Sequence, residues 1–190
     1  ARDLGVKADM VSASIHLDHL LEGKLIERIE KDIFLPAKED GYDQVWFVGV
    51  SLGGLNSLLF YRKYSEQICG VAVLAPYLAS RPLANEIQKA GGIMEWTPAP
   101  GSDRGEMEII EQHKLLAWLK EQSAKNNIEN IYLGYGKQDM YVVSSKLLAN
   151  ILTDKNVTVV EGKHNLKTAR KIWQRQLQTR NKTGLFNLCN

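Results

Sequence analysis

Apolar positions along this chain form short continuous runs, and stretches with helical spacing lie between them. Continuous apolar and β-branched runs are typical of strands that are covered on both faces of a sheet. The runs that predict strands are Asp9–Ile15, Gln44–Val48, Ile68–Leu74, Ile131–Tyr135 and Val157–Val160. The stretches that predict helices are Leu25–Leu35, Gly54–Lys63, Glu106–Gln122, Val142–Leu152 and Leu166–Leu177. Pro36 should end the first of these helices, because proline has no N–H to donate inside a helix.

This alternation predicts an α/β fold, with a mostly parallel sheet of about five to six strands and helices on both faces. The 190 residues are 44% hydrophobic, which is enough to bury the core of one domain, so we expect a single domain over 1–190. The Pro- and Gly-rich segment 77–105 interrupts this alternation of strands and helices and allows at most a short helix near 83–90. We expect this segment to be either a lid or a surface insertion that Met94 and Trp96 pack down.

The pentapeptide Gly49-Val50-Ser51-Leu52-Gly53 joins a predicted strand to a predicted helix. A serine on such a sharp turn is typical of a nucleophile elbow, although an ordinary tight turn could also carry a serine. Gly49 and Gly53 should leave room for the helix to pass close to the strand. The backbone N–H of Leu52 should lie at the helix N-terminus, where it could stabilise an oxyanion.

A nucleophilic serine needs a neutral imidazole to accept its proton. His164 follows the last predicted strand, so it should lie at the same sheet edge as Ser51 and act as the base. His113 lies on a helix face that we expect to be solvated, which makes it a poor candidate.

A base of this kind also needs an acid to fix its tautomer. Asp139 follows the penultimate strand in a Gly-rich turn and is the expected acid. The rival Glu161 lies on the same connection as His164 and is badly placed to face it. Asp154 is expected to be solvated near a helix end.

In chain order the candidates are Ser51, Asp139 and His164, within the strings GVSLGG, GYGKQD and GKHN. On these motifs and this order the chain resembles the α/β-hydrolase superfamily from about Asp9 to Leu177. The resemblance implies a serine hydrolase that cleaves small carboxylic esters through an acyl-enzyme on Ser51 and needs no cofactor. Acyl transfer or thioester cleavage by the same triad, and a non-catalytic binding protein of this fold, remain open alternatives.

The resemblance also implies an amino-terminal strand and an oxyanion loop that these residues do not contain, so we expect both to lie outside this sequence. His16, Asp18 and His19 follow the first predicted strand. They could ligate a metal, but the sequence shows no third ligand beside them. We therefore prefer a role in the cleft wall and expect no metal.

Composition and charge bear on the expected partners and on the cellular location. The net charge of +2 is spread without a basic stripe, so nucleic acid is not an expected partner, and no apolar run is long enough to span a membrane. Cys69 lies in an apolar strand far from Cys189, which suggests a buried reduced thiol and a cytoplasmic protein. The oligomeric state is not predicted.

Overall fold

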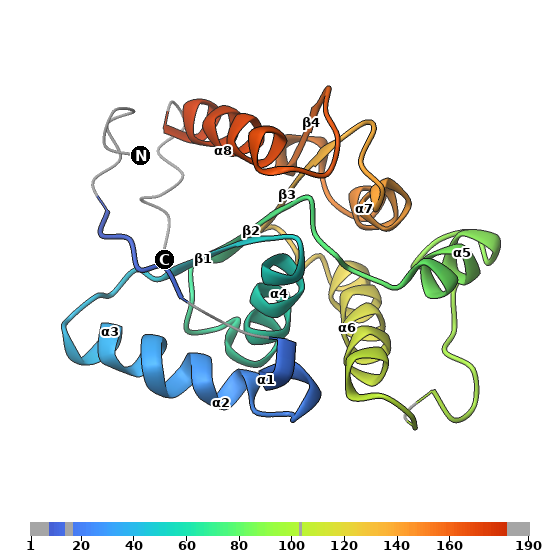
Figure 1. The fold of residues 1–190 in the computed structure, drawn as a ribbon, viewed down its shortest axis with the longest axis horizontal. Helices are drawn as coiled ribbons and strands as arrows, with labels where there is room; N and C mark the ends of the chain where they lie inside the picture. Colours follow the sequence, from blue (N-terminus) through green and yellow to red (C-terminus); the bar gives the residue numbers. More distant parts are fainter. Residues whose placement is uncertain (1–7, 14–16, 103, 182–190) are drawn as a thin grey trace.

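A computed structural model describes residues 8–13, 17–102 and 104–181, and four parallel strands form its central sheet (Figure 1). In spatial order these are β1 (Trp46–Val50), β2 (Gly70–Leu74), β3 (Ile131–Gly136) and β4 (Val157–Val160). The register places Val50 opposite Leu74, Leu74 opposite Gly134, and Gly136 opposite Val160. The carboxyl ends of the strands therefore lie along one edge of the sheet.

Helices and turns connect these strands. They are α1 (Leu17–Leu21), α2 (Leu25–Ile29), the π-helical turn η2 (Glu30–Phe34), α3 (Leu35–Glu39), α4 (Leu52–Tyr64), α5 (Arg81–Lys89), α6 (Met107–Ala124), α7 (Val142–Ala149), the 3-10 turn η3 (Asp154–Asn156) and α8 (Leu166–Asn181). The predicted helices after β1, before β3, after β3 and after β4 are confirmed, each with small differences at its ends.

The two faces of the sheet are covered by different helices. Successive residues of a strand point to opposite faces. In β2, Val71 and Val73 belong to the larger core, which includes α4, α6 and α7, whereas Leu74 belongs to a smaller cluster with Ile172 of α8. Figure 1 shows α8 on one side of the sheet and α4 on the other.

The prediction of five to six strands is wrong for the described residues, which contain four. The expected strand Asp9–Ile15 is not formed over residues 8–13, and positions 14 and 15 lie outside the described residues. No described strand pairs with this segment, and Met10 and Val11 are 63% and 78% exposed. Its apolar residues therefore do not fill a sheet face. The amino-terminal strand and oxyanion loop implied by the resemblance stay a prediction.

The prediction that a helix stops at Pro36 is also wrong, because α2, η2 and α3 continue helically from Leu25 to Glu39. The π-helical turn precedes the proline, and the Leu35 N–H donates to the Glu30 carbonyl five residues back. This wider turn changes the hydrogen-bond register just before the residue that cannot donate.

The irregular segment before α6 packs on the body of the protein through its own aromatic side chain. Trp96 is 1% exposed, and its indole N–H donates to Glu86 of α5 at 2.7 Å. The ring of His113 lies 5.7 Å from that of Trp96 and is half-buried, so the expectation of a solvated histidine is wrong. The lid or insertion over 77–105 and the single domain over 1–190 stay predictions.

Cys69, the residue before β2, is disulfide-bonded, which contradicts the expectation of a reduced thiol. Cys189 lies outside the described residues. The expectation of a cytoplasmic location rests partly on a reduced thiol, which the structure contradicts, and it stays an untested prediction.

The turn from β1 to α4 has the strained backbone that an elbow needs. Ser51 has φ 54° and ψ −119°, a region that non-glycine residues rarely adopt. Backbone bonds hold it there: the Ser51 N–H donates to Leu74 O at 3.1 Å, and Ser51 O accepts from the N–H of Tyr77 at 3.0 Å. The strain is therefore balanced by contacts with β2 and with the segment after it.

The two elbow glycines do not have the same role. A Cβ on Gly49 would lie 2.0 Å from the backbone oxygen of Gly53, so a side chain there would push α4 away from β1. A Cβ on Gly53 would meet nothing within 4 Å. Only the first glycine leaves room for the helix, contrary to the expectation for Gly53.

We predict that Gly49→Ala lowers the free energy of unfolding by about 1–3 kcal/mol or more, as overpacking does. The matched variant Gly53→Ala should leave it unchanged or raise it by up to about 1 kcal/mol, because alanine is the better helix former. Urea unfolding followed by circular dichroism measures both. Equal losses in the two variants would contradict this assignment.

Candidate active site

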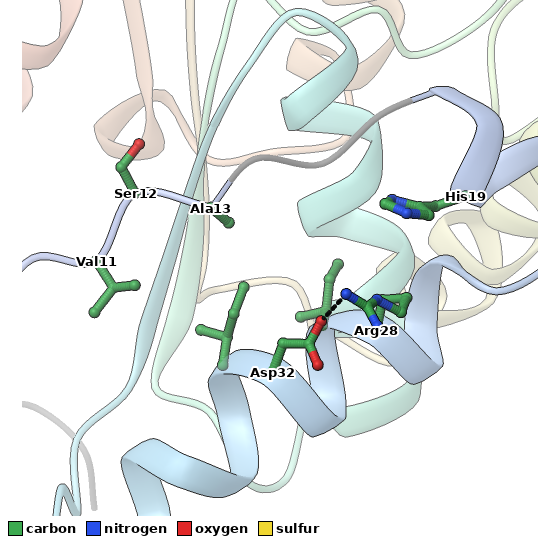
Figure 2. A pocket seen from close by; sticks show the side chains of 8 residues that line it. Val11, Ser12, Ala13, His19, Arg28 and Asp32 are labelled. Carbon is green, nitrogen blue, oxygen red and sulfur yellow. Dashed lines mark ion pairs between the residues drawn. The ribbon is translucent and has the colours of Figure 1, made fainter.

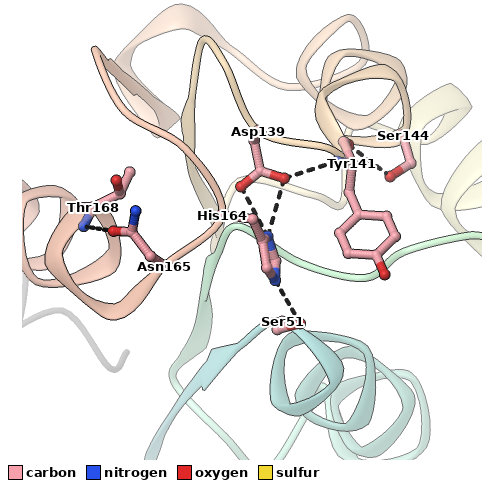
Figure 3. A network of polar contacts seen from close by, with 7 residues as sticks. All are labelled: Ser51, Asp139, Tyr141, Ser144, His164, Asn165 and Thr168. Carbon is pink, nitrogen blue, oxygen red and sulfur yellow. Dashed lines mark hydrogen bonds and ion pairs between the residues drawn. The ribbon is translucent and has the colours of Figure 1, made fainter.

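Three side chains from the carboxyl edge of the sheet meet in one hydrogen-bonded row (Figure 3). His164 Nε2 lies 2.9 Å from Ser51 Oγ, and His164 Nδ1 lies 2.9 and 3.0 Å from the two carboxylate oxygens of Asp139. The Asp139 side chain is fully buried, whereas that of His164 is 22% exposed. The structure thus brings together the serine, histidine and aspartate that the sequence singled out.

This geometry selects one imidazole tautomer. An ionised carboxylate can only accept, so Nδ1 carries the hydrogen that it donates to Asp139. The lone pair of Nε2 is then free to accept the hydrogen of the Ser51 hydroxyl. Asp139 Oδ1 also accepts the Tyr141 N–H at 2.8 Å, which fixes the carboxylate from a second direction. The arrangement can therefore move a proton from Ser51 to His164.

Each loop of the site is closed by local hydrogen bonds. Asn165 Oδ1 accepts the N–H of Thr168 at 2.9 Å, so the residue after His164 caps the start of α8 (Figure 3). The turn after β3 is closed by the Asp139 N–H, which donates to Gly136 O at 3.1 Å. The loops that carry His164 and Asp139 are thus held at the start of α8 and at the end of β3.

Polar contacts also join the two loops to each other. Gln138 Oε1 accepts the N–H of Gly162 at 2.7 Å, and the Gln138 N–H donates back to Gly162 O at 3.0 Å. Glu161 pairs with Lys137 at 2.6 Å, and this cation is the main reason that the pKa of Glu161 is lowered. Glu161 therefore holds the loops together and does not contact His164.

Tyr141 packs against the histidine from the side. The Tyr141 ring meets the His164 ring edge-on, with centroids 5.0 Å apart and planes at 81°. Tyr77, whose N–H holds the Ser51 carbonyl, packs against Tyr141 with centroids 5.1 Å apart. Sequence patterns did not single out Tyr141, Tyr77 or Gln138; for Tyr141, its place two residues after Asp139 was a signal.

Tyr77 is itself tied to α6. Burial raises the pKa of Tyr77, and a hydrogen bond to the Glu108 carboxylate raises it further, so the phenol stays neutral. Glu108 accepts from Gln112 Nε2 at 3.0 Å, and Gln112 Oε1 accepts the Ser80 N–H at 2.9 Å. This chain of bonds fixes the segment that follows β2.

Leu52, the expected oxyanion donor, is the first residue of α4. Among the described residues no backbone acceptor pairs with its N–H, whereas the N–H groups of Gly54 and Leu55 both donate to Ser51 O. The Leu52 N–H therefore lies at a helix N-terminus beside Ser51, where a negatively charged atom would be favoured.

A cavity of about 230 Å³ lies away from these three side chains, between the 11–13 segment and α2 with η2 (Figure 2). His19 and the ion pair of Arg28 with Asp32, at 2.7 Å, line it. His16 lies outside the described residues. Within the described ranges no group of three His, Cys, Asp or Glu side chains could hold a metal. In the same part of the chain, no helix is long and apolar enough to cross a bilayer.

No protein-family model matches the chain, and no curated protein matches it. Among solved structures it is similar to Est1E from Butyrivibrio proteoclasticus, with 15% identity over 90% of this chain and 72% of that chain and a TM-score of 0.57. A ferulic acid esterase matches with 15% identity over 84% of this chain and 61% of its own, at a TM-score of 0.54. The lip1 protein of Acinetobacter baumannii AYE matches with 14% identity over 94% of this chain and 72% of its own, at a TM-score of 0.50. The chain therefore has the α/β-hydrolase fold over most of its length.

Proposed function

We propose that this protein is a serine hydrolase that cleaves carboxylic esters through an acyl-enzyme on Ser51. The observation that carries the proposal is the continuous row from Ser51 Oγ through both nitrogens of His164 to the Asp139 carboxylate, with each step at 2.9–3.0 Å. One structural neighbour, a ferulic acid esterase, supports the same class of reaction.

In the proposed reaction, Ser51 Oγ attacks the acyl carbon while His164 Nε2 accepts the hydroxyl proton. The oxyanion that forms is stabilised on one side by the Leu52 N–H. Asp139 stabilises the positive charge that develops on the imidazole. The bond to the alcohol then breaks, and its oxygen takes the proton from Nε2. Water, activated by the same nitrogen, releases the acid and restores Ser51.

A fluorophosphonate probe should label the folded full-length protein once, at Ser51, because among the described serines this one shares its hydrogen with an imidazole. Ser51→Ala should abolish the labelling. The matched control is Ser57→Ala, which removes a serine that is 7% exposed in α4, the helix that follows Ser51. Mass spectrometry of the labelled peptide measures the outcome. Absence of labelling in folded protein, or labelling elsewhere, would sink the proposal.

Asp139→Asn should reduce kcat for a nitrophenyl ester by roughly 10³–10⁴-fold, by analogy with the triad of trypsin-like proteases, because the amide no longer fixes the tautomer. Glu161→Gln is the matched control: it removes a neighbouring carboxylate that pairs with Lys137 and not with His164, so kcat should change only a few-fold. Similar losses in both variants would show that Asp139 has no special role.

Product analysis in the presence of a competing alcohol or thiol separates hydrolysis from acyl transfer. The free acid should dominate when water completes the reaction. A predominant transfer product would replace the hydrolase assignment with that of an acyltransferase that uses the same three side chains.

A further inference from the structure

A second cavity, of about 240 Å³, lies between α5 and α7, beside Tyr141. Its lining residues are Ala79, Arg81, Ala84, Asn85, Met140, Tyr141, Val143 and Ser144. None of Ser51, Asp139 and His164 lines it, but two of its lining residues connect it to them. The Tyr141 ring contacts the His164 ring, and Ala79 lies two residues after Tyr77, whose N–H holds the Ser51 carbonyl.

The electrostatics of this cavity favour an anion. Arg81 is solvent-exposed and is the one charged residue in the lining, and no described carboxylate forms an ion pair with it. It is also the first residue of α5, whose first turn contains no acid. A cation at a helix N-terminus opposes the helix dipole. The sequence thus breaks a local rule at this position, as proteins do mainly at functional sites.

The other walls of the cavity set the shape of the group it can take. Ala79, Ala84, Met140 and Val143 are apolar, so a short hydrocarbon segment can lie against them. The cavity therefore suits a short chain that ends in one anionic group.

The position of the cavity indicates which half of an ester enters it. In the proposed reaction His164 Nε2 returns its proton to the departing alcohol, so the alcohol must lie on the histidine side of Ser51. The wall that the cavity shares with the site is Tyr141, which packs on His164. This Tyr141 contact is what connects the cavity to the alcohol side of the site, since no triad residue lines the cavity itself.

We propose that this cavity binds the alcohol portion of the ester and that Arg81 selects alcohols bearing a carboxylate or a phosphate. This inference rests on the proposed hydrolase function and names its substrate class. A guanidinium recognises both anions through paired hydrogen bonds, so the shared feature is the terminal anion.

The test compares two nearly isosteric acetyl esters, 3-acetoxypropanoate and 3-acetoxypropanamide, by acetate release. The wild-type protein should show a higher kcat/KM for the carboxylate, and Arg81→Gln should reduce that preference about tenfold. Arg81→Lys should retain part of it, because the charge stays but the paired geometry is lost. Lys89→Gln, at the other end of α5 and outside the cavity, is the matched control and should change nothing. The acetyl ester of 2-hydroxyethyl phosphate distinguishes the two anions.

A binding measurement tests the anion site independently of the hydrolase function. Ligand-observed NMR should detect 3-hydroxypropanoate, and not 3-hydroxypropanamide, on Ser51→Ala protein, with the signal lost in the Ser51→Ala/Arg81→Gln double variant. Turnover of both esters with a preference that Arg81→Gln leaves unchanged would overturn the cavity proposal and leave the hydrolase intact. Absence of turnover and of Ser51 labelling, with anion binding that still depends on Arg81, would overturn the hydrolase and keep the anion site. No Arg81-dependent binding would overturn the cavity proposal directly.

Discussion

Four parallel strands end at one edge of the sheet, and three of those ends lead into the residues of the proposed triad. Parallel pairing keeps the carboxyl ends together whatever lies between the strands in sequence. This is why Ser51 and His164, which are 113 positions apart, can lie within hydrogen-bond distance. The strand register therefore brings the three residues to one edge of the sheet, and the loops then orient their side chains.

This orientation depends on short polar contacts between neighbouring loops. Gln138 binds the backbone of Gly162, Lys137 pairs with Glu161, and Asn165 caps α8. The exposed ion pair contributes little on its own, since surface salt bridges are worth about 0–1 kcal/mol. The glutamine and asparagine contacts satisfy backbone groups, and these fix the direction in which the acid and base side chains point.

The sequence predicted the elements whose signals are local. Ser51 followed a strong apolar run and preceded a helical one, and the structure has β1 and α4 at these places. Predictions failed where tertiary contacts decide. The Asp9–Ile15 run has strand-like residues but no described partner, and Pro36 is accommodated by a π-helical turn that no residue pattern announces. The contact of Tyr141 with His164 joins two loops, so periodicity within either loop could not reveal it.

The small cluster beneath α8 has a consequence for heat resistance. Helix α8 starts two residues after His164 and packs its Ala169 and Ile172 against Leu74 and Val160 of the sheet, whereas the opposite face of the sheet has a much larger core. Parts of a protein with few buried apolar contacts open at lower free energy than the rest. Warming would thus detach His164 from Ser51 and Asp139 while α4 and the elbow are still folded, so these contacts would be lost before global melting.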